Sequence, residues 1–167
     1  MERIVPRESR VGRFDVEARI WIAEHQRAVH RDRPQIPLLL VGPFDNDHAA
    51  LRSILRKPDF RLLRARSLRR ADVLLRKATI PVVVVERTFP GGCWKDVWAA
   101  VQKASLRPAP RLIVVANRAD DRLWNEVVHA GGYDVLAKPF ESEELVGIIT
   151  AAWDHWRLET EAAGVSA

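Results

Sequence analysis

The chain has 167 residues, of which 47% are hydrophobic and 29% charged, values that suit a single globular domain. Cys93 is the only cysteine, which excludes an intrachain disulfide and a cysteine-rich metal cluster. No apolar run approaches the roughly 20 residues that cross a bilayer, and the amino-terminal stretch lacks the apolar core of a secretory signal. We therefore expect a cytoplasmic protein without a membrane partner.

Residues 1–35 form an extension whose residue pattern differs from that of the rest of the chain. The pattern predicts a helix at about 15–31, because Asp15 suits the N-cap and the basic residues His30 and Arg31 suit the last turn. One face of this helix carries apolar side chains, from Val16, Ile20 and Ala23. Such a face is suited to docking on the same chain or on a second copy.

From residue 36 onward the pattern alternates strand and helix. Short apolar runs predict strands at 37–41, 60–65, 80–85, 112–115 and 133–137. Helical spacing predicts helices at 48–55, 67–78, 94–103, 121–130 and 141–156. Strands that alternate with helices in this way form a doubly wound parallel sheet, so we expect an α/β domain at 36–157 and a C-terminal tail at 158–167.

The net charge of +5 is unevenly distributed. Between Arg52 and Lys77 there are ten Lys or Arg residues and two acidic ones. A basic surface can attract nucleic acid, which makes the segment 52–77 an alternative contact surface. Its arginines, however, alternate with leucines as on the solvated faces of one strand and one helix. We therefore do not expect nucleic acid to be the partner.

Three spacings in the second half of the chain carry a family resemblance. The third strand ends at Glu86 in the run VVVVE-RTFPGG, Ala116 follows 30 residues later, and Lys138-Pro139-Phe140 begins another 22 residues on. This spacing resembles the receiver domain of two-component response regulators. The resemblance implies a five-stranded flavodoxin-like receiver fold, here with an extra N-terminal helix, and a cis peptide before Pro139.

The resemblance also implies a phosphoacceptor pocket, from which this chain departs. In receivers an acidic pair, an acceptor aspartate, a hydroxyl residue and a lysine hold Mg²⁺ and the phosphoryl group. Here Gly42-Pro43 takes the place of the acidic pair, Glu86 that of the aspartate and Ala116 that of the hydroxyl residue, while Lys138 is kept. We therefore expect no cofactor.

Two further acids, Asp45 and Asp47, follow Gly42-Pro43 closely. The register places them at the start of the first helix after the first strand, where we expect them to act as helix caps. A shifted loop would instead turn one inward and allow Mg²⁺ to bind. The two readings lead to different chemistry at the pocket.

Glu86 is open to three interpretations. Its carboxylate projects about one methylene further than that of aspartate, so it can reach Lys138 and form an ion pair that imitates the phosphorylated state. It can equally be a tolerated polar residue in a disused pocket. The third interpretation is direct phosphorylation of Glu86, without the usual metal ligands.

Three aromatic residues are candidates for an interface. Trp153 and Trp156 lie one turn apart on the last helix, which belongs to the surface that receivers use to dimerise. Tyr133 should share a face of the fifth strand with Val135 by strand alternation. The alternative for the tryptophans is packing against the N-terminal helix.

Together these features predict a receiver-like protein of bacterial phosphorelay signalling that is not an enzyme. We expect a protein-interaction module that works without phosphorylation, with a signalling protein, a histidine kinase or a second copy as partner. One alternative is a nucleic-acid-binding protein that uses the segment 52–77. The other is a receiver that is still phosphorylated on a non-standard site.

Overall fold

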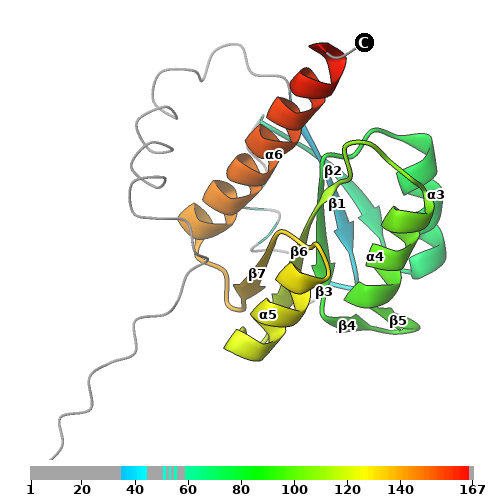
Figure 1. Ribbon diagram of the computed structural model, residues 1–167. Coiled ribbons are helices and arrows are strands. Elements are labelled where there is room, and N and C mark those ends of the chain that lie inside the picture. Colours follow the sequence, from blue (N-terminus) through cyan, green and yellow to red (C-terminus); the bar gives the residue numbers. More distant parts are fainter. Residues whose placement is uncertain (1–34, 45–50, 52, 54, 56–58, 166–167) are drawn as a thin grey trace, which may run out of the picture. The chain divides into compact units, whose positions relative to one another are not determined.

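A five-stranded parallel sheet forms the centre of the protein. The structure is a computed structural model that describes residues 35–44, 51, 53, 55 and 59–165. The strands are β1 (Ile36–Val41), β2 (Phe60–Ala65), β3 (Val82–Glu86), β6 (Arg111–Ala116) and β7 (Asp134–Ala137). They lie in the order β2-β1-β3-β6-β7, with every neighbouring pair parallel (Figure 1). The predicted doubly wound flavodoxin-like sheet is thus confirmed.

The helices follow the strands along the chain. They are α3 (Leu68–Lys77), α4 (Trp94–Lys103), α5 (Asp121–His129) and α6 (Ser142–Val165). Leu51, Ser53 and Leu55 are also helical, as predicted, whereas the rest of the helix expected at 48–55 lies outside the described residues. The N-terminal helix predicted at 15–31 lies outside them as well. None of the helices in the described part of the chain combines the length and the apolar character needed to span a membrane.

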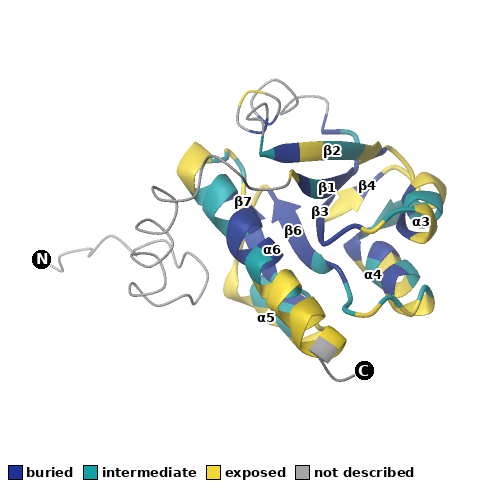
Figure 2. Cartoon of the chain, turned by 90° about the horizontal axis from the view of Figure 1, so that it is seen from above, coloured by how far each residue is buried: buried dark blue, intermediate teal, exposed yellow. Residues whose placement is uncertain are grey.

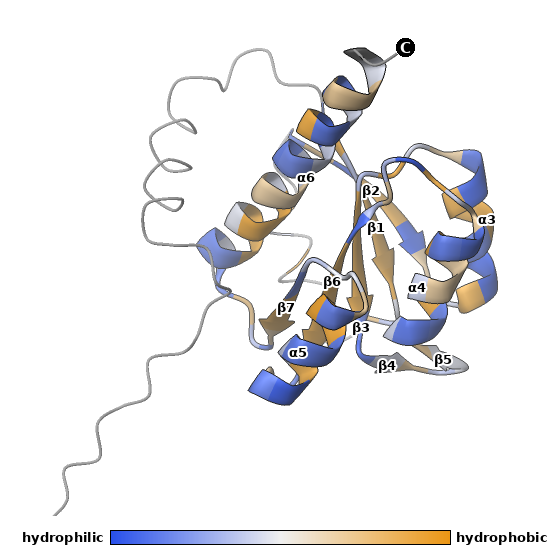
Figure 3. Ribbon diagram, viewed as in Figure 1, coloured by the Kyte–Doolittle hydropathy of each residue, from blue (hydrophilic) through white to orange (hydrophobic). Residues whose placement is uncertain are grey.

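Two apolar layers hold the sheet between the helices. Leu39, Val83 and Val114 pack on one face of the sheet against α3, α4 and α5. Leu38, Val84 and Ile113 alternate with them and pack on the other face against α6. Because both faces are buried, the central strands are continuously apolar, which explains why their sequences predict them so well (Figures 2 and 3).

Helix α6 is longer than predicted. It continues nine residues beyond its expected end at Trp156, so most of the tail predicted at 158–167 is helix through Val165. The segment RLETEAA after Trp156 contains no glycine or proline and is rich in good helix formers. Arg157 and Glu161 also pair across one turn, with 3.8 Å between nitrogen and oxygen. Without a stop signal, the helix propagates.

A small hairpin after β3 was not predicted as strand. Its two antiparallel strands are β4 (Thr88–Phe89) and β5 (Gly92–Cys93). A turn at Pro90-Gly91 joins them, and Gly91 has a φ of 84°, which favours glycine. The hairpin is too short for a periodic apolar pattern, which explains why the sequence did not reveal it.

Asp134, the first residue of β7, is a buried carboxylic acid. It is 2% exposed. Its Oδ1 accepts hydrogen bonds from the Val135 backbone N–H at 2.8 Å and the Trp124 indole N–H at 3.2 Å. Its buried Oδ2 has no hydrogen-bond partner among the residues described. Burial raises the pKa of Asp134 above its ordinary value of 3.8, and the two hydrogen bonds oppose this only in part.

The raised pKa of Asp134 makes stability depend on pH. Between 3.8 and the higher folded-state pKa the folded protein binds more protons than the unfolded chain, so stability falls as pH rises through this window. Asp134→Asn should raise the melting temperature at neutral pH and flatten this fall, by about 1.4 kcal/mol for each unit of pKa shift. Circular-dichroism melts across acidic and neutral pH, with Asp72→Asn as control, test this. A variant that melts lower at neutral pH would contradict it.

Candidate functional site

The carboxyl ends of four strands bring the predicted pocket residues to one edge of the sheet. Gly42 follows β1, Glu86 ends β3, Ala116 ends β6 and Lys138 follows β7. Backbone hydrogen bonds fix these strand ends: Gly42 N–H to Ala65 O at 2.9 Å, Arg87 N–H to Val115 O at 2.8 Å and Lys138 N–H to Ala116 O at 2.9 Å. The sequence spacing therefore identified residues that do lie together.

An ion pair between Glu86 and Lys138 occupies the centre of this edge. Glu86 Oε1 lies 2.9 Å from Lys138 Nζ, and the two side chains are only 13% and 19% exposed. A charge-assisted hydrogen bond at this depth is screened by salt much less than a surface pair. The peptide between Lys138 and Pro139 is cis, as the resemblance implies. The structure thus contains the ion pair that the first interpretation of Glu86 requires.

Phe44 covers the lysine from the other side. Lys138 Nζ lies 5.6 Å from the centroid of the Phe44 ring, within the range of a cation–π interaction. Phe44 is 3% exposed and has a φ of 45°, an uncommon conformation for an aromatic residue. Its role could not be read from the sequence, where the only signal is an aromatic residue placed directly after Gly42-Pro43.

Gly42 is coupled to Glu86 by packing. A Cβ atom at Gly42 would lie 3.0 Å from Glu86 Cγ and 3.3 Å from Glu86 Cδ, and the φ of 131° is itself unfavourable for any other residue. The side chain of Glu86 therefore lies where an acidic side chain at position 42 would have to begin. The glycine in place of an acid at position 42 is therefore what makes room for the longer acid at position 86.

A small hollow lies beside the loop that follows β1. The hollow beside Gly42, Pro43 and Phe44 measures about 20 Å³, with Leu40, Arg64 and Arg66 completing its wall. That volume holds about one water molecule. Neither Glu86 nor Lys138 lines it.

The described residues do not fit a Mg²⁺ site. Mg²⁺ needs several oxygen ligands in octahedral geometry, usually including carboxylates. Glu86 Oε1 is bonded to Lys138, and Ala116 offers a methyl group where receivers offer a hydroxyl. Within the described part of the chain no three His, Cys, Asp or Glu side chains converge. Asp45 and Asp47 lie outside that part, so their expected capping role stays a prediction.

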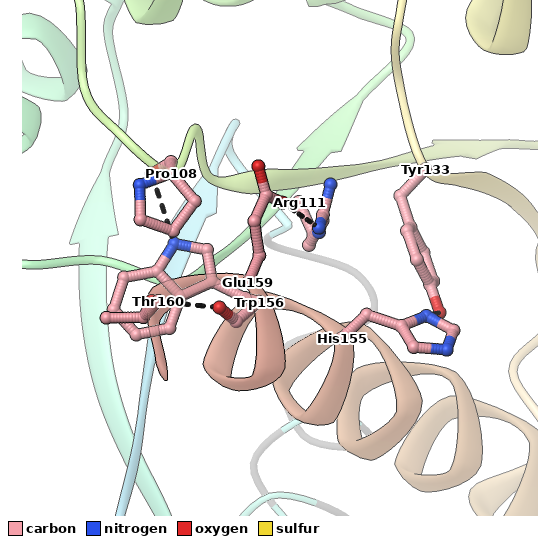
Figure 4. Close-up of polar contacts among 7 residues, drawn as sticks. All are labelled: Pro108, Arg111, Tyr133, His155, Trp156, Glu159 and Thr160. Carbon is pink, nitrogen blue, oxygen red and sulfur yellow. Dashed lines mark hydrogen bonds and ion pairs between the residues drawn. The ribbon is translucent and has the colours of Figure 1, made fainter. Parts of the chain in front are cut away.

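The three aromatic residues expected at an interface all have contacts within the chain, and Figure 4 shows those of Tyr133 and Trp156. The Tyr133 hydroxyl lies 2.7 Å from His155 Nδ1, and the Trp156 indole N–H donates to the Pro108 carbonyl at 3.2 Å. Trp153 is 6% exposed and packs in the apolar layer beneath α6. An ion pair between Arg111 and Glu159 adds to these contacts. They fasten α6 to the sheet, and an interface at these residues stays a prediction.

The prediction that Tyr133 shares a face with Val135 is wrong. Tyr133 packs against the layer beneath α6, whereas Val135 belongs to the layer beneath α3, α4 and α5. Strand β7 begins only at Asp134, so strand alternation does not extend back to Tyr133. Burial raises the pKa of the Tyr133 phenol, and the neighbouring Asp134 carboxylate raises it further.

The packing of Gly42 against Glu86 generates a stability prediction. Gly42→Ala should lower stability by about 1–3 kcal/mol, because of the strained φ and the 3.0 Å approach to Glu86 Cγ. Gly147→Ala in α6 is the matched control: its added Cβ meets no atom within 4 Å, so stability should rise by up to about 1 kcal/mol. Urea unfolding measures both. Truncating Glu86 to Ala should recover part of the loss at position 42; equal effects of the two glycine changes would refute the coupling.

No protein-family model matches the chain, and no curated protein matches it in sequence. Solved structures do match it. The signal receiver domain of an HD-domain-containing protein from Pseudomonas fluorescens Pf-5 is 21% identical, with a TM-score of 0.64; the match covers 74% of this chain and 98% of that one. The beryllofluoride-activated NtrC4 receiver domain dimer is 22% identical, with a TM-score of 0.64 and coverage of 72% and 98%.

A structure of an adenylate cyclase from Rhodopirellula baltica is also similar, at 23% identity, a TM-score of 0.64 and coverage of 79% and 97%. Sequence identities at this level are evidence for a shared fold only. The matches span nearly the whole of the other chains. The chain has the receiver fold of two-component response regulators.

Proposed function

We propose that this protein is a receiver-like module of bacterial phosphorelay signalling that acts by binding another protein, without phosphoryl transfer and without enzymatic activity. The observation that carries the proposal is the 2.9 Å contact between Glu86 Oε1 and Lys138 Nζ. The partner is a signalling protein, such as a histidine kinase, or a second copy of the chain. A cytoplasmic location fits this role and stays a prediction.

The ion pair supplies a reason for independence from phosphorylation. In receivers the lysine after the fifth strand neutralises an oxygen of the phosphoryl group. Here the Glu86 carboxylate gives Lys138 a permanent anionic partner, and Phe44 packs over the same ammonium group. These two contacts hold the lysine in position without a phosphoryl group. A partner protein that recognises this position of Lys138 binds the same conformation without phosphorylation.

The alternative of phosphorylation on Glu86 has less support. Its carboxylate oxygen Oε1 is engaged by Lys138 Nζ at 2.9 Å. The carboxylates that would bind Mg²⁺ in a receiver are replaced by Gly42 and Pro43. Phosphoryl transfer at this site would require the ion pair to break first.

The first test is an amide NMR titration of the full chain with Mg²⁺ and then beryllofluoride, a stable phosphoryl mimic. We expect no shifts clustered at residues 42–47, 86, 116 and 138 at millimolar Mg²⁺, because the carboxylates that would hold the ion are missing. A receiver that keeps its acceptor aspartate serves as the positive control. Clustered shifts at these residues would show a working pocket and overturn the proposal.

A second test addresses the ion pair. A partner captured with the wild-type chain should bind Glu86→Ala at least about tenfold more weakly, because Lys138 loses the anion that positions it and a part-buried charge is left unpaired. Glu143→Ala removes an exposed acid from α6 and serves as the matched control. If calorimetry gives equal partner affinities for wild type and Glu86→Ala, the ion pair is not needed for partner binding.

A further inference from the structure

The loop after β1 has an unusual backbone conformation. Gly42 and Phe44, on either side of Pro43, have φ angles of 131° and 45°. Such angles suit glycine, but for an aromatic residue they are uncommon and persist only where the surrounding structure enforces them. The one other non-glycine residue with a positive φ in the described part of the chain is Ser105, just after the end of α4, where a left-handed residue is common. Phe44 follows a strand, so its conformation needs another cause.

This conformation brings the loop into contact with both members of the buried ion pair. Gly42 packs against Glu86, whose Cγ lies 3.0 Å from the place of a Cβ atom at position 42. Two residues later, the centroid of the Phe44 ring lies 5.6 Å from Lys138 Nζ, which stands over the ring. The ring is 3% exposed and belongs to the apolar layer beneath α6. One end of the loop therefore contacts the acid, and the other end contacts the ammonium group.

The ion pair itself is not sealed from solvent. The side chains of Glu86 and Lys138 keep exposed fractions of 13% and 19%. An ammonium group has three donors, of which one is bonded to Glu86 Oε1 at 2.9 Å. A phosphate or sulfate ion that reached the ammonium group would compete with Glu86, since lysine binds such oxyanions as a point charge. A lasting ion pair therefore needs a neighbour of the lysine that oxyanions avoid.

The Phe44 ring has this property. The face of an aromatic ring is negative, so it attracts an ammonium group and repels an oxyanion. An aliphatic side chain would bury apolar surface in the same layer without this effect. We propose that Phe44 is a specificity-determining residue of the site, which keeps oxyanions in solution from competing with Glu86 for Lys138. The inference rests on the proposed function and deepens it, because a module that acts without phosphoryl transfer must also keep free phosphate from its lysine.

The test is NMR of the lysine ammonium groups in the full chain, without a partner. An ammonium group gives a resolved signal when hydrogen bonding and burial slow the exchange of its protons with water. Wild type should show the Lys138 signal, and phosphate or sulfate at up to about 50 mM should shift it no more than potassium chloride of equal ionic strength does, because the ring repels the anions. Absence of the signal in wild type, or a specific shift with either oxyanion, would overturn the proposal.

Two leucine variants separate the effect of the ring from ordinary packing. Phe44→Leu keeps an apolar side chain beside Lys138 but removes the ring, so phosphate should now shift the Lys138 signal and speed its proton exchange at least about tenfold. Phe60→Leu is the matched control, because Phe60 is 7% exposed in the same apolar layer and no described cation lies over its ring. It should lose similar stability yet respond to phosphate as wild type does. Equal responses of the two variants would reduce Phe44 to a core residue and overturn the proposal.

A fluorinated ring gives a second measurement that does not depend on the folding of Phe44→Leu. Pentafluorophenylalanine, incorporated at position 44 alone, keeps the shape of the ring and reverses its quadrupole, so phosphate should again compete for Lys138. A wild-type response of this variant would contradict the proposal. Failure here is distinguishable from failure of the proposed function, which would appear as clustered shifts with Mg²⁺ and beryllofluoride in the wild-type chain.

Discussion

Because all five strands are parallel, each connection returns along a face of the sheet, and the loops after β1, β3, β6 and β7 must share one edge. Everything at the candidate site depends on this constraint. Gly42, Glu86 and Lys138 are far apart in sequence, yet they meet because two apolar layers hold the strands in register. The ion pair at that edge is the product of this frame, of the departures at Gly42 and Glu86, and of the retained Lys138.

The sequence predicted the elements whose signals are continuous and missed those that depend on backbone conformation. Val82–Val85 is apolar throughout because both sheet faces are covered, and such a run indicates a strand without help from its neighbours. Glu86 and Lys138 were found by spacing alone. The cover over Lys138 was not, since Phe44 reaches it through a positive φ that no residue pattern encodes. Helix α6 is longer than predicted because the segment that directly follows Trp156 contains no glycine or proline to end it.

The fold separates two kinds of electrostatics. At the carboxyl edge a single ion pair is withdrawn from solvent, so its geometry is fixed and salt has little influence on it. On β2 and α3 the cations are exposed, so their interactions weaken as the ionic strength rises. The buried ion pair is suited to holding a conformation. The two can therefore change independently.

The contact between Gly42 and Glu86 has a consequence for how the chain could change over time. An acidic residue introduced at position 42 would meet the Glu86 side chain and an unfavourable φ. A shorter aspartate at position 86, introduced first, would withdraw the carboxylate from Lys138 while no acid at position 42 could yet bind a metal. Each single replacement toward a phosphoacceptor pocket is thus unfavourable by itself. Such a pocket would require replacement at both positions together.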